Sequence, residues 1–120
     1  GEGGKDTLMG GSGDELIRGQ GGSDLLCGGG GSDRLIGGRG ADTFLIDLSA
    51  GPSGLAVLAD FDVSTDHIAI DLGPSGQIEA NQITYDQASG TLFCQLSGDS
   101  IAIAVVSSQP ALHLSDLDFV

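Results

Sequence analysis

The sequence predicts an all-β protein in which a stack of short repeats is followed by a β-rich cap. Glycine recurs with a period of nine through residues 1–45, whereas residues 46–120 carry the alternating apolar residues typical of strands. The chain holds 22 glycines and only 4% aromatic residues, a poor composition for an ordinary close-packed core. We therefore expect a repeat array over 1–45 and a capping segment over 46–120.

The array consists of five nonapeptides: GEGGKDTLM, GGSGDELIR, GQGGSDLLC, GGGGSDRLI and GGRGADTFL. Positions one and four are glycine in every repeat, position six is acidic, and position eight is large and apolar. A flexible glycine linker would not keep three residue classes in one register. The pattern therefore indicates a folded repeat.

Each repeat divides into a turn and a strand. Glycine tolerates positive φ, so the first six residues can form a tight turn in which backbone carbonyls converge. The last three form a short strand whose middle residue points inward. One unit buries a single side chain and must stack. With two units per coil, Asp6, Asp24 and Asp42 share one edge, and Glu15 and Asp33 share the other.

Stacked carboxylates repel unless a cation lies between them. Calcium accepts six to eight oxygens at about 2.3–2.6 Å and tolerates irregular geometry, whereas magnesium requires an octahedron and retains its water. No His or Cys recurs at a fixed position of the repeat, which argues against zinc or copper. The repeat therefore predicts calcium.

The nonapeptides resemble the G-G-x-G-x-D-x-U-x array of RTX (repeats-in-toxin) proteins. The resemblance implies a right-handed parallel β-roll with three or more Ca²⁺ ions between adjacent turns. Asp6 with Asp24, Asp24 with Asp42, and Glu15 with Asp33 would each bracket one ion. The remaining implied metal-site residues are turn glycines: Gly4, Gly11, Gly13, Gly22, Gly29, Gly31, Gly38 and Gly40.

The array departs from the family pattern at three positions. Glu15 replaces the usual aspartate, and its extra methylene is expected to weaken the site that it shares with Asp33. Glu2 and Gln20 replace glycine at position two, so those turns must accommodate a Cβ.

The chain after the array also resembles the segment that closes the roll in secreted RTX proteases and lipases. The resemblance rests on ADTFLIDLS and LADFDVSTDHIAIDL. It implies a further ion near the D-F turn, with Asp60, Asp62 and Asp66 as candidate ligands. The alternative is that these acids form Asx-turns or solvate a loop.

The remaining pattern predicts antiparallel strands. Ile68, Ile70 and Leu72 share one face of a strand, residues 83–86 and 91–96 read as a hairpin, and residues 101–106 form a further buried strand. These strands are expected to cover the open end of the roll. Cys27, at position nine, is expected to face outward and Cys94 to lie on a buried face, as two separate thiols.

The net charge of −13 disfavours nucleic acid and anionic membrane surfaces as partners. All four Lys and Arg residues lie within 1–45, whereas residues 46–120 contain ten acids and no Lys or Arg. This charge predicts a folded state that depends on a bound cation. No apolar run approaches the roughly 20 residues of a membrane span, so no membrane insertion is expected.

Catalytic motifs are missing from the sequence. It contains no G-x-S-x-G, no H-E-x-x-H and no phosphate-binding loop. We expect the chain itself to be no enzyme, although the parent protein could be a secreted one.

The RTX resemblance implies a secreted, extracellular bacterial protein that leaves the cell unfolded and folds outside in calcium. Its implied partners are calcium ions, a type I secretion apparatus and an upstream domain of the parent protein. The end of the chain, LSDLDFV, is similar to an uncleaved type I export signal, and it also fits a final strand packed on the cap. The alternative functions are a structural or adhesive segment of a surface-layer or adhesin protein, or a non-catalytic part of a secreted protease or lipase.

Overall fold

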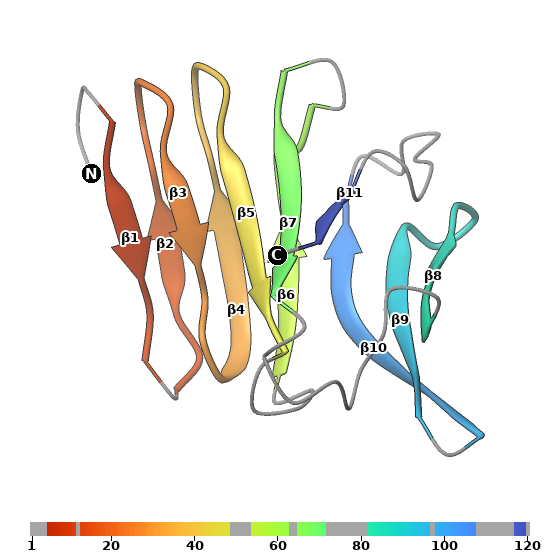
Figure 1. The fold of residues 1–120 in the computed structure, drawn as a ribbon. Coiled ribbons are helices and arrows are strands. Elements are labelled where there is room, and N and C mark those ends of the chain that lie inside the picture. The colour runs from red at the N-terminus through yellow and green to blue at the C-terminus, as the bar shows by residue number, and fades with distance from the viewer. Residues whose placement is uncertain are drawn as a thin grey trace.

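The computed structural model describes residues 5–11, 13–48, 54–62, 65–71, 82–96, 98–107 and 117–119. These residues form two β-sheets with the core between them (Figure 1). The first sheet has the order β1 (Thr7–Met9), β3 (Leu25–Cys27), β5 (Thr43–Asp47), β7 (His67–Asp71) and β11 (Leu117–Phe119). The second has the order β2 (Leu16–Arg18), β4 (Gly31–Ile36), β6 (Gly54–Leu58), β10 (Asp99–Val106), β9 (Thr91–Leu96) and β8 (Ile83–Asp86).

The strands of the repeats pair in parallel at a spacing of 18 residues. Leu8 aligns with Leu26, and Leu26 aligns with Phe44 in the first sheet. Ile17 aligns with Leu35 in the second. One coil therefore contains two nonapeptides, one in each sheet, and the predicted all-β, parallel roll is confirmed.

Position-eight side chains form the core of the roll. Leu26, Leu35 and Phe44 are fully buried because alternate side chains of each strand point inward. Leu8 and Ile17, in the first coil, are only partly buried and pack against this core.

The stacking continues beyond residue 45. Phe44 aligns with Ile68 of β7, and Leu35 aligns with Leu58 of β6. β10 then pairs in parallel with β6, and β11 pairs in parallel with β7. Strands from the end of the chain thus extend both sheets of the coil. The division of the chain at residue 45 stays a prediction, and both sheets run across it.

The predicted hairpin forms the far end of the second sheet. β8 and β9 are antiparallel, with Thr84 opposite Phe93, and β9 and β10 are antiparallel with a register shift between Ala102 and Ala104. Leu72, expected on the same face as Ile68 and Ile70, lies outside the described residues.

Both cysteines are free and buried. Cys94 is buried as expected. The prediction that Cys27 faces outward is wrong: Cys27 is only 2% exposed, and the longer Met9 and Leu45 flank it in register on the neighbouring strands. Burial raises the pKa of both thiols.

Candidate calcium site

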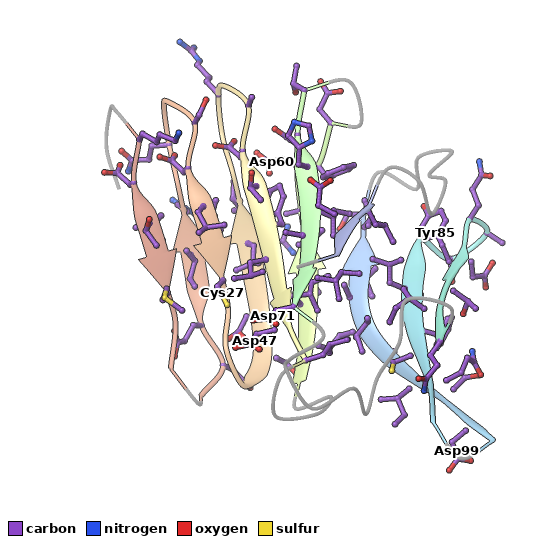
Figure 2. The ribbon with its side chains drawn as sticks, in the orientation of Figure 1. Cys27, Asp47, Asp60, Asp71, Tyr85 and Asp99 are labelled. Carbon is purple, nitrogen blue, oxygen red and sulfur yellow. The ribbon has the colours of Figure 1, made fainter. Side chains whose placement is uncertain are left out.

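The turns of the roll stack along two edges (Figure 1). The turns that lead into β1, β3, β5 and β7 lie along one edge, here called the Asp24 edge after the residue at its centre. The turns that lead into β2 and β4 lie along the other, here called the Glu15 edge. Figure 2 shows Asp60 at the Asp24 edge, and Cys27, Asp47 and Asp71 toward the opposite one.

Position-six carboxylates on the Asp24 edge are linked by a hydrogen-bond ladder. The Asp6 amide donates to Oδ1 of Asp24, the Asp24 amide to Oδ1 of Asp42, and each N···O distance is 2.9 Å. The Asp42 amide donates in the same way to Oδ1 of Asp66, again at 2.9 Å. The three acids predicted to share this edge therefore do so, and Asp66 adds a fourth step.

The second oxygen of each repeat carboxylate on this edge has no partner. Oδ2 of Asp6, Asp24 and Asp42 is buried and accepts no hydrogen bond. Asp24 is 2% exposed and Asp42 is fully buried. Because a buried charge without a partner is unfavourable by several kcal/mol, these oxygens require either a cation or a proton.

The glycine at position one leaves the space that a cation would need. A Cβ on Gly19 would lie 2.5 Å from Oδ2 of Asp24 and 2.8 Å from the carbonyl oxygen of Gly37 in the next turn. A carboxylate and a carbonyl from successive turns thus converge on one point. Hard oxygen donors in an irregular arrangement suit calcium.

Glycines at positions two and four allow the turns to stack closely. Gly29 and Gly31 have φ of 79°, and a Cβ on either would lie 2.5 and 2.7 Å from the carbonyl oxygens of Gly11 and Gly13. Gly38 and Gly40, with φ of 84° and 98°, lie similarly close to the carbonyl oxygens of Gln20 and Gly22. Gly22 itself has φ of 92°. Gly4 lies outside the described residues.

Gln20 adopts a left-handed backbone conformation, as position two of the repeat requires, although it carries a Cβ. Its φ is 67°, and its carbonyl accepts a hydrogen bond of 2.9 Å from the Arg39 amide. A side chain in this region is unfavourable by about 1–2 kcal/mol relative to glycine.

The Glu15 edge repeats the ladder and the space over the position-one glycine, and it differs in one hydrogen bond. The Glu15 amide donates to Oδ1 of Asp33 at 2.9 Å, so the two predicted acids do meet. Oε1 of Glu15, however, accepts the amide of Gly11 in its own turn at 2.7 Å. Sequence reasoning missed Asp14, whose Oδ1 accepts the Ser32 amide at 2.7 Å, because position five is not part of the repeat pattern.

The acids that follow the array bind backbone amides. Asp60 accepts the amides of Gly37 and Gly38 at 2.8 and 2.7 Å, one on each oxygen. Asp66 accepts the Asp42 amide on Oδ1 and the Asp62 amide on Oδ2, at 2.9 Å each. Three of these bonds tie the segment to the preceding coil, which neither the metal-site prediction nor the Asx-turn alternative anticipated. Metal ligation by Asp60 and Asp66 stays a prediction.

Two of the repeat carboxyls hold protons more tightly than free aspartate does. Burial raises the pKa of Asp42 to about 6, and the charges of Asp66, Asp24 and Asp60 add to the rise against the lowering effect of the Asp24 amide. Burial also raises the pKa of Asp33, with smaller contributions from Glu15 and Asp14.

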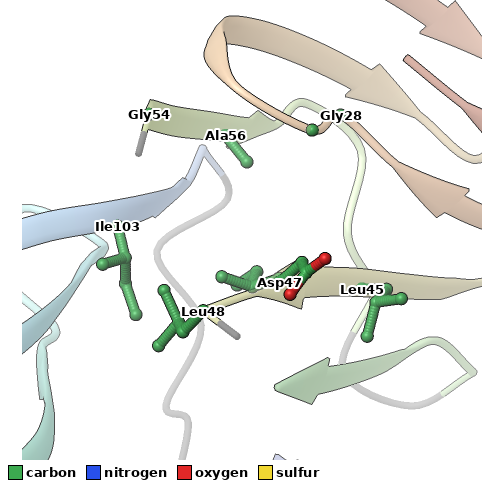
Figure 3. A pocket seen from close by; sticks show the side chains of 9 residues that line it. Gly28, Leu45, Asp47, Leu48, Gly54, Ala56 and Ile103 are labelled. Carbon is green, nitrogen blue, oxygen red and sulfur yellow. The ribbon is translucent and has the colours of Figure 1, made fainter. Parts of the chain in front are cut away.

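Among the described residues, metal-ligating side chains are not gathered into a cluster. No three His, Cys, Asp or Glu side chains there converge on one point, so an ion would depend largely on backbone carbonyls. A cavity of about 20 Å³ lies between the Gly28 turn and Asp47, Leu48, Gly54 and Ile103 (Figure 3). It accommodates no more than a water-sized group.

A family model described as "RTX calcium-binding nonapeptide repeat (4 copies)" matches residues 1–35 and again residues 9–44. Residues 1–44 are RTX calcium-binding repeats. The RTX match thus covers the turns that carry Asp6, Glu15, Asp24, Asp33 and Asp42. RTX repeats of this kind are typical of secreted bacterial proteins and are generally structural rather than catalytic.

The fold also resembles a solved structure. The solution structure of the AlgE6R3 subunit from the Azotobacter vinelandii mannuronan C5-epimerase is 23% identical, with a TM-score of 0.50. The match covers 98% of this chain and 79% of that one, and it supports the fold. No curated protein sequence matched significantly. Within the described ranges, no helix is long and apolar enough to cross a membrane.

Proposed function

We propose that this chain is a calcium-driven folding module that serves as the C-terminal folding and secretion unit of a larger bacterial protein. The observation that carries the proposal is the row of buried, unpartnered Oδ2 atoms on Asp6, Asp24 and Asp42. Without a cation these charges oppose folding, and with calcium they become ligands, so ion binding supplies folding free energy.

Five acids and the turn carbonyls form the proposed ligand set for three or more ions. Asp6, Asp24 and Asp42 would hold two ions on the Asp24 edge, and Glu15 with Asp33 would hold one on the other. The net charge of −13 supports the coupling, because self-repulsion disfavours the compact state until cations are bound.

Secretion is the setting in which such coupling is useful. Calcium is scarce inside cells and abundant outside, so the chain would stay unfolded during export and fold on release. The proposed partners are therefore a type I secretion apparatus and an upstream domain. Fusing the chain to a reporter in cells with and without a type I exporter tests this. Release that does not depend on the exporter would contradict it.

Membership of a larger enzyme is the second candidate. The AlgE6R3 subunit, similar in fold, comes from an epimerase. That likeness supports a non-catalytic place beside a catalytic domain, and catalysis by this chain itself is not proposed. A structural or adhesive role would use the same calcium chemistry.

Far-UV circular dichroism during titration with CaCl₂ tests the central proposal, with MgCl₂ as the control ion. We expect a steep coil-to-β transition in calcium alone. Asp24→Asn should weaken it, because the amide keeps an acceptor for the Asp6 amide but loses the charge. Asp99→Asn, which removes an exposed acid from the β10 end of the cap, is the matched control. A spectrum that responds to neither ion would exclude calcium-driven folding.

A further inference from the structure

We infer that the two edges fill with calcium in sequence, the Asp24 edge at lower free calcium than the Glu15 edge. This rests on the proposed function, because it concerns the order in which the proposed sites load. It assigns a partly loaded state to the module, with one edge closed by ions and the other still free of them.

The driving force for ion binding is greatest on the Asp24 edge. Every buried side-chain oxygen without a hydrogen-bond partner among the described residues lies there, on Asp6, Asp24 and Asp42. An ion placed beside such an oxygen relieves a desolvated charge that nothing else compensates. The free energy gained per ion is correspondingly large.

On the Glu15 edge, a hydrogen bond already stabilises one carboxylate without an ion. Glu15 uses Oε1 to accept the Gly11 amide at 2.7 Å, and it is only partly buried. Neither Glu15 nor Asp33 has a buried oxygen without a partner. A charge-assisted hydrogen bond of this kind stabilises the carboxylate, so an ion gains less by binding there.

The extra methylene of Glu15 contributes to the difference. Asp24 forms no such bond with Gln20, and Asp42 forms none with Gly38. The Oδ1 atoms of these two aspartates accept amides of the preceding coil instead. Glu15 therefore closes its own turn with Oε1, while its Oε2 still faces the space over Gly10. The edges differ because the oxygens of Asp24 and Asp42 that face this space are fully buried and have no partner.

Nitrogen-15 NMR of the full chain, with free calcium set by a chelator buffer, measures the two edges separately. The amides of Asp24 and Asp42 report on one edge, and those of Gly11 and Asp33 on the other. We expect the first pair to reach the bound position at about tenfold lower free calcium, the factor that corresponds to one hydrogen bond to a charged group.

Two variants sharpen the assignment. Glu15→Asp should bring the midpoint of the Gly11 and Asp33 amides toward that of the Asp24 edge. Glu15→Gln should raise that midpoint and leave the Asp24 edge unchanged. Asp99→Asn should alter neither.

The outcomes separate the inference from the function on which it rests. Binding at a single midpoint for all four amides in the unaltered chain would overturn sequential filling and leave calcium binding intact. Loading of the Glu15 edge first would also overturn it. An absence of calcium-dependent shifts at every amide would overturn the proposed function itself.

Discussion

Two repeat aspartates of the Asp24 edge divide two tasks between their carboxylate oxygens. In Asp24 and Asp42, Oδ1 accepts the amide of the preceding turn and so fixes the stacking of one coil on the next. Oδ2 accepts nothing and faces the space over the position-one glycine. Asparagine could perform the first task but not the second, which separates stacking from ion binding at a single position.

Gly19→Ala should disrupt the calcium site, because the new Cβ would lie 2.5 Å from Oδ2 of Asp24 and 2.8 Å from the Gly37 carbonyl. We expect a loss of about 1–3 kcal/mol in stability at saturating calcium, measured by denaturant unfolding. Gly21→Ala is the matched control, since nothing lies within 4 Å of its Cβ. Equal stability of the two variants would contradict the proposed ion position.

Acidification should stabilise the calcium-free fold. The pKa of Asp42 is about 6 in the fold and 3.8 ordinarily, so the folded state binds more protons between these values. The contribution is fully present below the ordinary pKa and is lost as pH rises through 6. It amounts to roughly 3 kcal/mol at most.

The folded fraction in chelator, followed by far-UV circular dichroism as the pH is lowered from 7.5 to 4.5, measures this effect. Asp42→Asn should flatten the profile, because the amide does not titrate in this range. Calcium affinity should fall below pH 6, where the ion must displace a proton. Stability that rises with pH in chelator would show that another group dominates.

The sequence could predict the ladder of Asp6, Asp24 and Asp42 because a strict period fixes which turns stack. It could not place Asp66 in that ladder. The step from Asp42 to Asp66 is 24 residues rather than 18, so the period has already broken where the ladder ends. The sequence could not predict the contact of Asp14 with the Ser32 amide for a different reason. That contact depends on turn geometry at a position whose residue varies between repeats.

Strands β10 and β11 join the roll although they follow it at a distance in sequence. Alternation in residues 101–106 predicted a buried strand, yet nothing local indicated that it would pair in parallel with β6. Parallel pairing needs a crossover, and its register is set by contacts between distant segments rather than by the strand itself. The hairpin of β8 and β9 was predictable because its turn is local.

Leu117→Ala tests whether β11 stabilises the roll. Leu117 is 5% exposed and aligns with Ile68, which is fully buried. Truncation should destabilise the calcium-loaded chain by about 2–5 kcal/mol, measured by denaturant unfolding. Asp118→Asn, on the exposed neighbour, should have little effect. A neutral Leu117→Ala would mean that β11 adds no stability.

Charge and size set the behaviour of the whole molecule. With a net charge of −13 and few aromatic residues, the chain is poorly equipped to collapse by hydrophobic burial alone. The folded radius of gyration is 13.3 Å, against about 35 Å for an unfolded chain of this length.

Small-angle X-ray scattering should therefore report a large compaction on adding calcium. We expect a radius near the unfolded value in chelator and near the folded value at saturating calcium, with magnesium leaving the chain expanded. A compact chain in chelator at neutral pH would show that the sheets close without ions.

The return of β10 to β6 also bears on folding kinetics. Residues 59–98 separate the two strands, so their pairing closes a long loop and makes a strongly non-local contact. More calcium can speed the loading of the turns, but it cannot accelerate the diffusion of a distant strand. After stopped-flow mixing, the folding rate should level off as calcium increases, and a rate that keeps rising in proportion would place the slow step at ion binding. The slowest event in a calcium-triggered module would then belong to the part of the chain with no repeats.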